Sequence, residues 1–513
     1  MGLAERVHEI DAFETARGHL AVMEKRLSSP DMMGAEHGEL ESYVMAEGRE
    51  LQRLLLQAHL ELRAARELRV RVTGADRVQR TTTRSSKRPL TTLVGGVDIP
   101  RTAYQARDVN GLHPIDGALN LPPTVYSHGV ERFVAEHAAI MSFDDVRSEL
   151  LSHTGARVPK RQMEEIAVRA AVDFDTFYAA RRAEGELQEQ TRDPLVMTFD
   201  GKGIVMVPED LRPATKKAAG KAARKLGTRL SPGEKRNRKR MAEVAAIYTV
   251  PRFVREPHDV LADLDGTRDL DTRPERPKVR NKRVWASVER DLKVVIEETF
   301  HEARARDPNH QRQWAVLVDG NKDQLASIKT MADTLGAVFI IIDLMHVLEY
   351  LWRAAHALCE DGAKATETWV QERLLELLQG RHATEIATAM RRQARAAKLQ
   401  GSALAAVQDA ADYLRDYAPY MRYGEALQWG LPIATGVIEG ACRYLVKDRM
   451  DRGGARWTLA GAEAVLRLRA LRASGDFDAY WQWHLREELR RNHTERYADS
   501  RMPNPMRPLR LVK

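Results

Sequence analysis

Apolar residues near the N-terminus recur with the period of a helix. Leu51, Leu54, Leu55, Ala58 and Leu62 stand at positions i, i+3, i+4, i+7 and i+11, and Arg and Glu fill the opposite face. This spacing places the apolar side chains on one face of an amphipathic helix. We expect the N-terminal residues, 1–78, to form helices that pack on the rest of the molecule or on another subunit.

The pattern changes to short β-branched runs after these helices. Thr-rich stretches flank Gly95 and Gly96 within residues 80–105. Runs of this kind around a glycine pair predict a β-hairpin.

Two helical patterns follow the hairpin, over 128–153 and 159–180. The second begins with Lys160 and Arg161. A helix-turn-helix with a DNA-recognition helix has this pattern, and so has an ordinary helical hairpin. Residues 79–190 are expected to form a DNA-binding region, with both interpretations of the helix pair open.

From residue 194 on, strand patterns alternate with helix patterns. Strands are predicted over 194–200, ending at Asp200, over 203–208 as a returning hairpin strand, and over 241–250, 313–320 and 337–343. Helices are predicted over 282–305 and 322–335. Such alternation favours a mixed or parallel sheet covered by helices.

The remaining chain is predicted to be mainly helical. Residues 344–430 are helical almost throughout, and 431–440 begin a helix that carries Glu439. The expected fold is an α/β core interrupted by an all-α insertion and preceded by a mainly helical DNA-binding region. Its segments are 1–78, 79–190, 191–343, 344–430, 431–475 and a C-terminal helix with a basic tail, 476–513.

Charge is distributed unevenly over the 513 residues, whose formal net charge is +8. Residues 212–240 contain twelve Lys or Arg and one acid, whereas the rest of the chain has 69 basic and 72 acidic residues. This basic insert indicates a polyanionic partner, with a solvated loop as the alternative.

Composition excludes several classes of protein. The two cysteines, Cys359 and Cys442, support neither a disulfide framework nor a Cys-based zinc site. The apolar run at 337–342 is far shorter than the ~18 residues that span a bilayer, and the charged N-terminus does not resemble a signal peptide. We therefore expect a cytoplasmic protein without a membrane partner.

Three carboxylates carry the candidate chemistry. Asp200 and Asp319 each follow an apolar strand and precede a glycine, and Glu439 lies at the start of a helix. Carboxylates after neighbouring strands converge at one edge of a sheet, where α/β proteins place their sites. Two Mg²⁺ or Mn²⁺ ions would relieve the repulsion between three such acids and support phosphoryl displacement. The alternative for each residue is a turn or helix cap.

Four blocks resemble those of ISKra-type bacterial insertion-sequence transposases: TFDGKG, VLVDGNKDQ, IIDLMHVLEYLW and ATGVIEGACRYLVKDRMDRGGARWT. The resemblance implies a DDE transposase with a ribonuclease-H-like fold, similar in plan to the Mutator-like group. It assigns Asp200, Asp319 and Glu439 to a triad that binds two Mg²⁺ or Mn²⁺ ions, and residues 344–430 to the insertion. Relatives often carry cysteine pairs in the N-terminal β region, and this chain has none there.

Asp343 and His346 match the Asp-x-x-His signature of related transposases. At i and i+3 they share a helix face and could contact DNA or support the metal site. The alternative is a buried Asp–His hydrogen bond that orients the helix.

Basic residues near these acids are expected to contact phosphates, against the alternative of solvated surface. They are Arg443, Lys447 and Arg452 after Glu439, Lys202 after Asp200, and Lys235, Arg236, Arg238, Lys239 and Arg240 in the insert. Cys442 is expected to be a core residue rather than a nucleophile.

These features together predict a transposase that binds the terminal inverted repeats of an insertion sequence, cleaves the ends and joins them to target DNA. Joining two ends implies a homodimer or a larger assembly, and the location would be the bacterial cytoplasm and nucleoid. The alternatives are a ribonuclease-H-like structure-specific nuclease and a domesticated DNA-binding protein without transposition.

Overall fold

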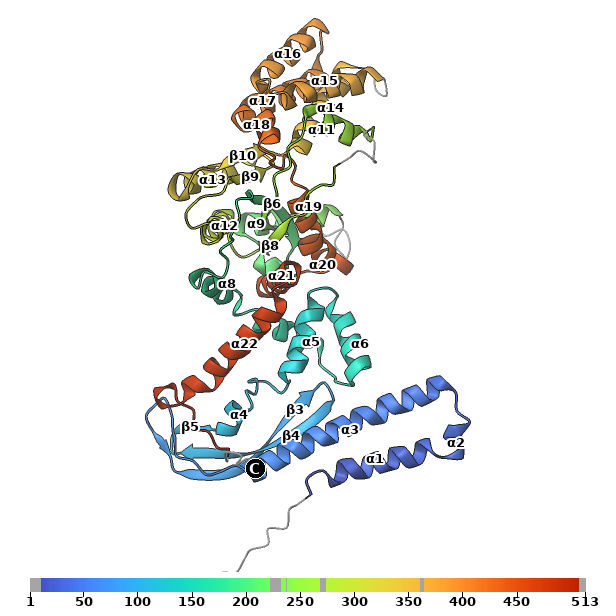
Figure 1. Ribbon diagram of the computed structural model, residues 1–513, viewed down its shortest axis with the longest axis vertical. Coiled ribbons are helices and arrows are strands. Elements are labelled where there is room, and N and C mark those ends of the chain that lie inside the picture. Colours follow the sequence, from blue (N-terminus) through green and yellow to red (C-terminus); the bar gives the residue numbers. More distant parts are fainter. Residues whose placement is uncertain (1–10, 222–231, 237, 268–273, 360–363, 507–513) are drawn as a thin grey trace, which may run out of the picture. The chain divides into compact units, whose positions relative to one another are not determined.

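The computed structural model describes residues 11–221, 232–236, 238–267, 274–359 and 364–506 (Figure 1). The chain divides into two compact units. Unit 1 contains the residues up to Phe174 and those from Phe477 on, and unit 2 contains Asp175 to Asp476. Unit 2 is thus inserted in the sequence of unit 1.

Unit 1 begins with two long helices joined by a short one. The helices are α1 (Glu14–Leu27), α2 (Pro30–Met33) and α3 (His37–Ala65). Helix α1 packs against α3, and α3 packs in turn against strand β4 (Gly95–Ala106). Leu60 of α3 enters a core cluster with Leu90, Val97 and Ile99. The predicted helices are therefore present, and α3 packs on the sheet of unit 1.

The predicted hairpin is formed by β3 (Thr82–Thr92) and β4, which pair antiparallel over their full length. The turn lies at residues 93–94, one step before the predicted glycine pair, and Gly95 has φ +125°. Strand β5 (Val109–Leu112) pairs with β4, and the short strands β1 (Val72–Thr73) and β2 (Gln79–Arg80) pair with each other.

The two helices predicted over 128–153 and 159–180 are each divided. The helices observed are α4 (Pro114–Ala118), α5 (His128–Ala138), α6 (Phe143–Thr154), α7 (Lys160–Ala170) and α8 (Phe174–Ala183). The first division follows from a capping box, because the Ser142 hydroxyl accepts from the Asp145 N–H and the Asp145 carboxylate accepts from the Ser142 N–H. This reciprocal cap starts a new helix where the apolar pattern alone runs on.

The C-terminal part of unit 1 is helix α22 (Phe477–Asn492), with the short turns η5 (Thr494–Arg496) and η6 (Ala498–Ser500). The Tyr480 hydroxyl donates to the Ala170 carbonyl oxygen at 2.7 Å, and both groups are buried. His484 lies 2.7 Å from the buried Asp173 carboxylate. Unit 1 is therefore closed by contacts between residues more than 300 positions apart in the chain.

Within the described residues, unit 2 contains a five-stranded sheet in the order β10-β9-β6-β7-β8. Its strands are β6 (Leu195–Val205), β7 (Lys239–Thr249), β8 (Arg280–Ser287), β9 (Trp314–Val318) and β10 (Phe339–Ile342). Strand β7 runs antiparallel to β6 and β8, whereas β9 runs parallel to β6 and β10. The predicted mixed sheet is thus observed, with β6 at its centre.

Two predictions about these strands were wrong. The residues expected to form a strand ending at Asp200 and a returning strand form one strand, β6, because β7 pairs with it from Leu195 to Val205. The charged helix predicted from residue 282 begins only at Leu292, since residues 280–287 form β8 and bury Val284, Trp285 and Ala286.

Helices cover the sheet and extend beyond it. They are η1 (Pro208–Asp210), α9 (Pro213–Lys221), α10 (Pro232–Arg236), α11 (Pro257–Asp265), α12 (Leu292–Arg306), α13 (Lys322–Leu335), α14 (Leu344–Leu358), α15 (Lys364–Leu378), α16 (Ala383–Ala396), α17 (Gly401–Tyr417), η2 (Ala418–Tyr420), α18 (Tyr423–Gln428), α19 (Gly436–Ala441), η3 (Cys442–Lys447), α20 (Asp448–Met450), η4 (Arg452–Gly454) and α21 (Leu459–Ser474). Helices α14 to α18 agree with the helical segment predicted over 344–430, and Figure 1 shows them gathered together, in yellow to orange. None of the described helices combines the length and apolar character needed to cross a membrane.

The described parts of the basic insert form regular elements rather than a loop. Residues 213–221 and 232–236 are helical, and Lys239 and Arg240 belong to β7. Residues 222–231 and 237 lie outside the described residues.

Candidate active site

Asp200 and Asp319 lie at the same level of two adjacent parallel strands. Thr198 of β6 pairs with Leu317 of β9, and each aspartate stands two residues beyond its member of this pair. Side chains two residues apart on a strand point to the same face. The sheet register therefore brings together two acids that are 119 positions apart.

Both aspartates line one cavity of about 580 Å³. Its other polar walls come mostly from β7 and the N-terminal ends of helices α12 and α13. They include Arg212, Lys239, Arg240, Glu243, Asp291, Lys293, Asn321 and Asp323. Cations and carboxylates thus share one polar site, an arrangement suited to a phosphate group accompanied by a divalent cation.

The Asp200 carboxylate is held by groups from two parts of the chain. One oxygen accepts from the Gly201 N–H at 2.6 Å, and the other accepts from the Cys442 thiol at 3.1 Å. Cys442 is buried, and burial together with the Asp200 charge raises the pKa of its thiol. The thiol is therefore a hydrogen-bond donor to Asp200 and is not activated as a nucleophile.

The backbone at Asp319 is fixed by its neighbours. The Tyr413 hydroxyl donates to the Asp319 carbonyl at 3.0 Å, and the carboxylate accepts from the Asn321 N–H at 3.0 Å. Gly320 has φ +102°, and an added Cβ would lie 3.3 Å from the Tyr413 hydroxyl and the Tyr417 ring. Glycine is therefore needed here both for the backbone conformation and for the close approach of α17.

Glu439 lies on α19, which packs against β6 and β7. Its carboxylate is exposed and accepts from the Thr435 hydroxyl at 3.4 Å. The described lining of the Asp200–Asp319 cavity does not include Glu439. The structure brings the Glu439 helix onto the strand of Asp200 but does not place the three carboxylates in one cavity.

Asp343 connects the second half of the sheet to the Glu439 segment. It is fully buried at the start of α14, where its carboxylate accepts from the Met345 N–H and lies 3.1 Å from the His346 ring nitrogen. The same carboxylate accepts from the Thr435 N–H at 3.0 Å. Hydrogen bonds therefore run from His346 through Asp343 and Thr435 to Glu439.

His346 is half-buried. The hydrogen bond to Asp343 raises the pKa of His346, and the charges of Asp319 and Glu349 add to this effect. The buried Asp–His hydrogen bond considered from the sequence is thus present in the structure.

Glu243 is an acid that the sequence reasoning missed. It lies on β7 opposite Gly201 and lines the cavity. Burial raises the pKa of Glu243; Arg212 opposes this shift, and the carboxylates of Asp200 and Asp291 add to it. Its signal in the sequence was a single charged residue among the apolar residues of 242–248.

The predicted basic residues differ in their surroundings. Arg443, Lys447 and Arg452 are exposed after Glu439, where the π-helical turn η3 changes the helix register, so Arg443 does not continue the regular face of Glu439. Arg240 donates to the Val288 carbonyl at 2.8 Å and is part of the fold. Lys202 is half-buried on β6 opposite Ala242, and Lys239 lies on β7 opposite Val205. Lys235, Arg236 and Arg238 occupy α10 and the residues after it.

In unit 1, the helix-turn-helix candidates stand at the exposed start of α7. Lys160 forms an ion pair with Asp144 of α6 at 2.7 Å, and Arg161 pairs with Glu165 at 3.2 Å. Both side chains are solvent-exposed, so neither pair removes the residue from the surface.

The donor chemistry of the cavity fits a hard divalent cation in part. Asp200 and Asp319 provide the carboxylate oxygens that Mg²⁺ and Mn²⁺ prefer. Among the described residues, however, no group of three or more His, Cys, Asp or Glu side chains lies close enough together to hold a metal ion. Two of the predicted ligands share a cavity, and the complete three-carboxylate set is not gathered.

No protein-family model matches the chain, and no curated protein is significantly similar to it.

Proposed function

We propose that the protein is a DDE transposase that binds the terminal repeats of an insertion sequence and catalyses metal-dependent cleavage and strand transfer. The proposal includes a ribonuclease-H-like core in unit 2. Its support comes from the four sequence blocks and from a mixed sheet that carries two of their acids at one level.

The observation that carries the proposal is the shared cavity of Asp200 and Asp319. Two acids from separate blocks meet there beside Arg212, Lys239 and Lys293, as a phosphodiester substrate requires. Glu439 belongs to a third block, and its helix packs on the same strands.

Asp200 and Asp319 would hold the first of the two proposed Mg²⁺ or Mn²⁺ ions, and Glu439 is the proposed third carboxylate ligand. Bound ions of this kind lower the pKa of a coordinated water and neutralise charge on the phosphoryl group. The chain's own residues prepare the site: Cys442 orients Asp200, Tyr413 fixes the backbone of Asp319, and the cavity cations bind phosphate oxygens.

A DNA-binding protein that keeps this fold without activity is the second candidate. The observation that favours it is the absence, within the described residues, of a three-ligand metal cluster. A ribonuclease-H-like nuclease that cuts without joining is the alternative within the enzyme class, and its geometry would be the same.

The test uses duplex DNA from the ends of the element that encodes the protein. Wild-type protein with Mg²⁺ should cleave these ends and join them to a target plasmid. Asp200→Asn, Asp319→Asn and Glu439→Gln should each reduce cleavage to the level seen without metal while DNA binding is kept. Asp333→Asn, an exposed acid on α13 outside the cavity, is the matched control.

Each outcome has a distinct meaning. Full cleavage by one of the three variants would remove that residue from the site. Cleavage without joining would identify a nuclease, and binding without cleavage by the wild-type protein would identify a DNA-binding protein.

A further inference from the structure

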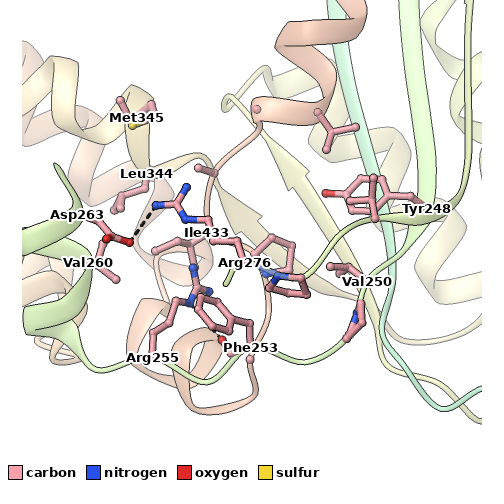
Figure 2. Close-up of a pocket in the computed structure, with 18 of the residues that line it drawn as sticks. Tyr248, Val250, Phe253, Arg255, Val260, Asp263, Arg276, Leu344, Met345 and Ile433 are labelled. Carbon is pink, nitrogen blue, oxygen red and sulfur yellow. Dashed lines mark hydrogen bonds and ion pairs between the residues drawn. The ribbon is translucent and has the colours of Figure 1, made fainter. Parts of the chain in front are cut away.

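A second cavity, of about 420 Å³, lies in unit 2 away from the acids of the first (Figure 2). Its walls come from the end of β7 and the residues after it, from α11, from the start of α14 and from residues 430–437. Most of the side chains are apolar, among them Phe253, Val260 and Ile433. A cavity of this size and lining is typical of a site for a small organic molecule.

Among the described lining residues, three are charged: Arg255, Asp263 and Arg276. Asp263 and Arg276 neutralise each other in an ion pair of 2.9 Å, drawn as the dashed line in Figure 2. Arg255 donates to the carbonyl oxygens of Phe253 and Leu431, and its guanidinium lies 5.5 Å from the centre of the Phe253 ring. The charges of the described lining residues therefore sum to one positive charge, that of Arg255.

Burial is unfavourable for this extra charge. It lowers the pKa of Arg255 to about 10, with Arg276 contributing in the same direction and Asp263 opposing it. A charged group in an apolar site is stabilised by a counter-ion that enters with its own hydrogen-bond acceptors. An anionic ligand would supply these acceptors.

We propose that this cavity binds a small amphipathic anion, with a compact apolar or aromatic body against Phe253, Val260 and Ile433 and one acidic group on Arg255. An extrahelical nucleobase fits less well, because reading a base edge requires several polar partners and the walls offer mostly aliphatic surface. The Arg255–Phe253 pair instead offers one charge beside one ring, which matches an aromatic acid.

Ligand binding here would reach the elements of the first site. Leu344 and Met345 in the wall directly follow Asp343, and Gly436 and Val437 directly precede the Glu439 turn. A ligand that packs on these residues would restrain the start of α19. This consequence rests on the proposed function, whereas binding itself does not.

The probe is 8-anilinonaphthalene-1-sulfonate, an aromatic body with one sulfonate, and its neutral counterpart is N-phenyl-1-naphthylamine. The full-length protein should bind one equivalent of the sulfonate with a rise in fluorescence. Arg255→Met should lower the affinity for the sulfonate at least about tenfold, the value of a charged hydrogen bond. The affinity for the neutral probe should change by no more than about twofold. Hydrogen exchange of the peptide covering 430–440 should slow when the sulfonate is bound.

Three further variants control the test. Ala434→Trp, which fills the cavity from an exposed wall position, should abolish binding of both probes. Asp263→Asn should increase the affinity for the sulfonate, because it removes a negative charge from the wall. This variant keeps the proposal testable if Arg255→Met does not fold. Arg422→Met should change nothing, because Arg422 also lies on an aromatic ring, that of Phe339, but outside the cavity.

Several results would overturn the proposal. They are binding of several equivalents, equal affinity for both probes, and sulfonate binding that neither Arg255→Met nor Ala434→Trp alters. If the triad variants lose DNA cleavage but bind the sulfonate normally, binding in this cavity does not depend on the triad. Normal probe binding by a protein that never cleaves DNA would refute only the proposed function.

Discussion

Cys442 shows how one buried side chain can hold a carboxylate of the candidate site without reacting itself. Its buried thiol donates to Asp200, and both its burial and that carboxylate raise the pKa of the thiol. A thiol that stays protonated alkylates slowly, since the thiolate is the nucleophile.

Iodoacetamide at about pH 8.5, near the pKa of a free thiol, should therefore label Cys359 in the folded protein and leave Cys442 unmodified. Cys359 is half-buried at the end of α14 and is the internal control. Both cysteines should be labelled in urea, and peptide mass spectrometry measures the two sites separately. Equal labelling in the folded protein would contradict the buried Cys442–Asp200 contact.

Residue types in strand contexts were sufficient to predict that Asp200 and Asp319 lie close together, and they line one cavity. Their partners were not predictable in the same way, because Cys442 lies 242 positions from Asp200 and Tyr413 lies 94 positions from Asp319. Contacts of this kind depend on how helices pack on the sheet, and no local pattern in the sequence encodes them.

Asp343 holds two elements together by hydrogen bonds, as Cys442 holds a single carboxylate. Its carboxylate caps α14 and accepts from Thr435 of the segment before α19, so one buried side chain joins two elements that are 92 positions apart.

Asp343→Ala should destabilise unit 2 by roughly 2–4 kcal/mol, because it removes a cap and leaves buried donors unpaired. Asp416→Ala, which removes an exposed ion pair with Arg415, should destabilise unit 2 far less. Urea unfolding followed by circular dichroism compares the two variants. Equal costs would show that the Asp343 hydrogen bonds contribute no more than surface charges do.

Element type was predictable where one signal dominated. Residues 322–335 have helical periodicity and form α13 at those bounds, and the apolar run at 314–318 forms β9. Prediction failed at β8, whose charged first half, Arg280 to Arg283, resembles a solvated helix. That segment becomes a strand because its second half is buried beside β7, and this is a tertiary effect.

At the scale of the whole molecule, unit 1 contains an acid-sensitive group. Burial lowers the pKa of His113 to about 4, and the charges of Arg101, Arg496 and Arg88 add to this effect against Asp116. The unfolded chain therefore binds more protons than the folded chain between pH 6.5 and about 4. Stability contributed by neutral His113 is complete above this window and is lost as the pH falls through it.

Thermal unfolding by calorimetry should show this loss as a lower melting temperature for unit 1 at acid pH. His113→Asn should flatten the pH dependence by about 1–2 kcal/mol, a discounted value because His113 is partly exposed. His382→Gln, an exposed histidine of unit 2, should leave the profile unchanged. An unaltered profile in His113→Asn would assign the acid sensitivity to other groups.

The uneven charge of the chain leads to a prediction about DNA affinity. Under the proposed function, the double variant Lys235→Gln with Arg236→Gln should weaken binding and reduce the slope of log affinity against log salt by about 2, or about 0.9 for each phosphate contact. The variant Arg392→Gln with Arg395→Gln removes equal charge from exposed positions of α16. Fluorescence anisotropy over a salt series measures the DNA affinity and its salt slope for both double variants and the wild type. Equal slopes for the insert variant and the wild type would show that DNA does not contact Lys235 and Arg236.

The insertion of unit 2 within unit 1 has a consequence for biosynthesis. The residues up to 174 leave the ribosome before unit 2. Ala170 and Asp173 can form their hydrogen bonds only after Tyr480 and His484 of α22 have been synthesised. Unit 2 can therefore complete its core while unit 1 is still open. A chain that stops before α22 would retain the sheet with Asp200 and Asp319 but would lose the closure of the segment that carries Lys160 and Arg161.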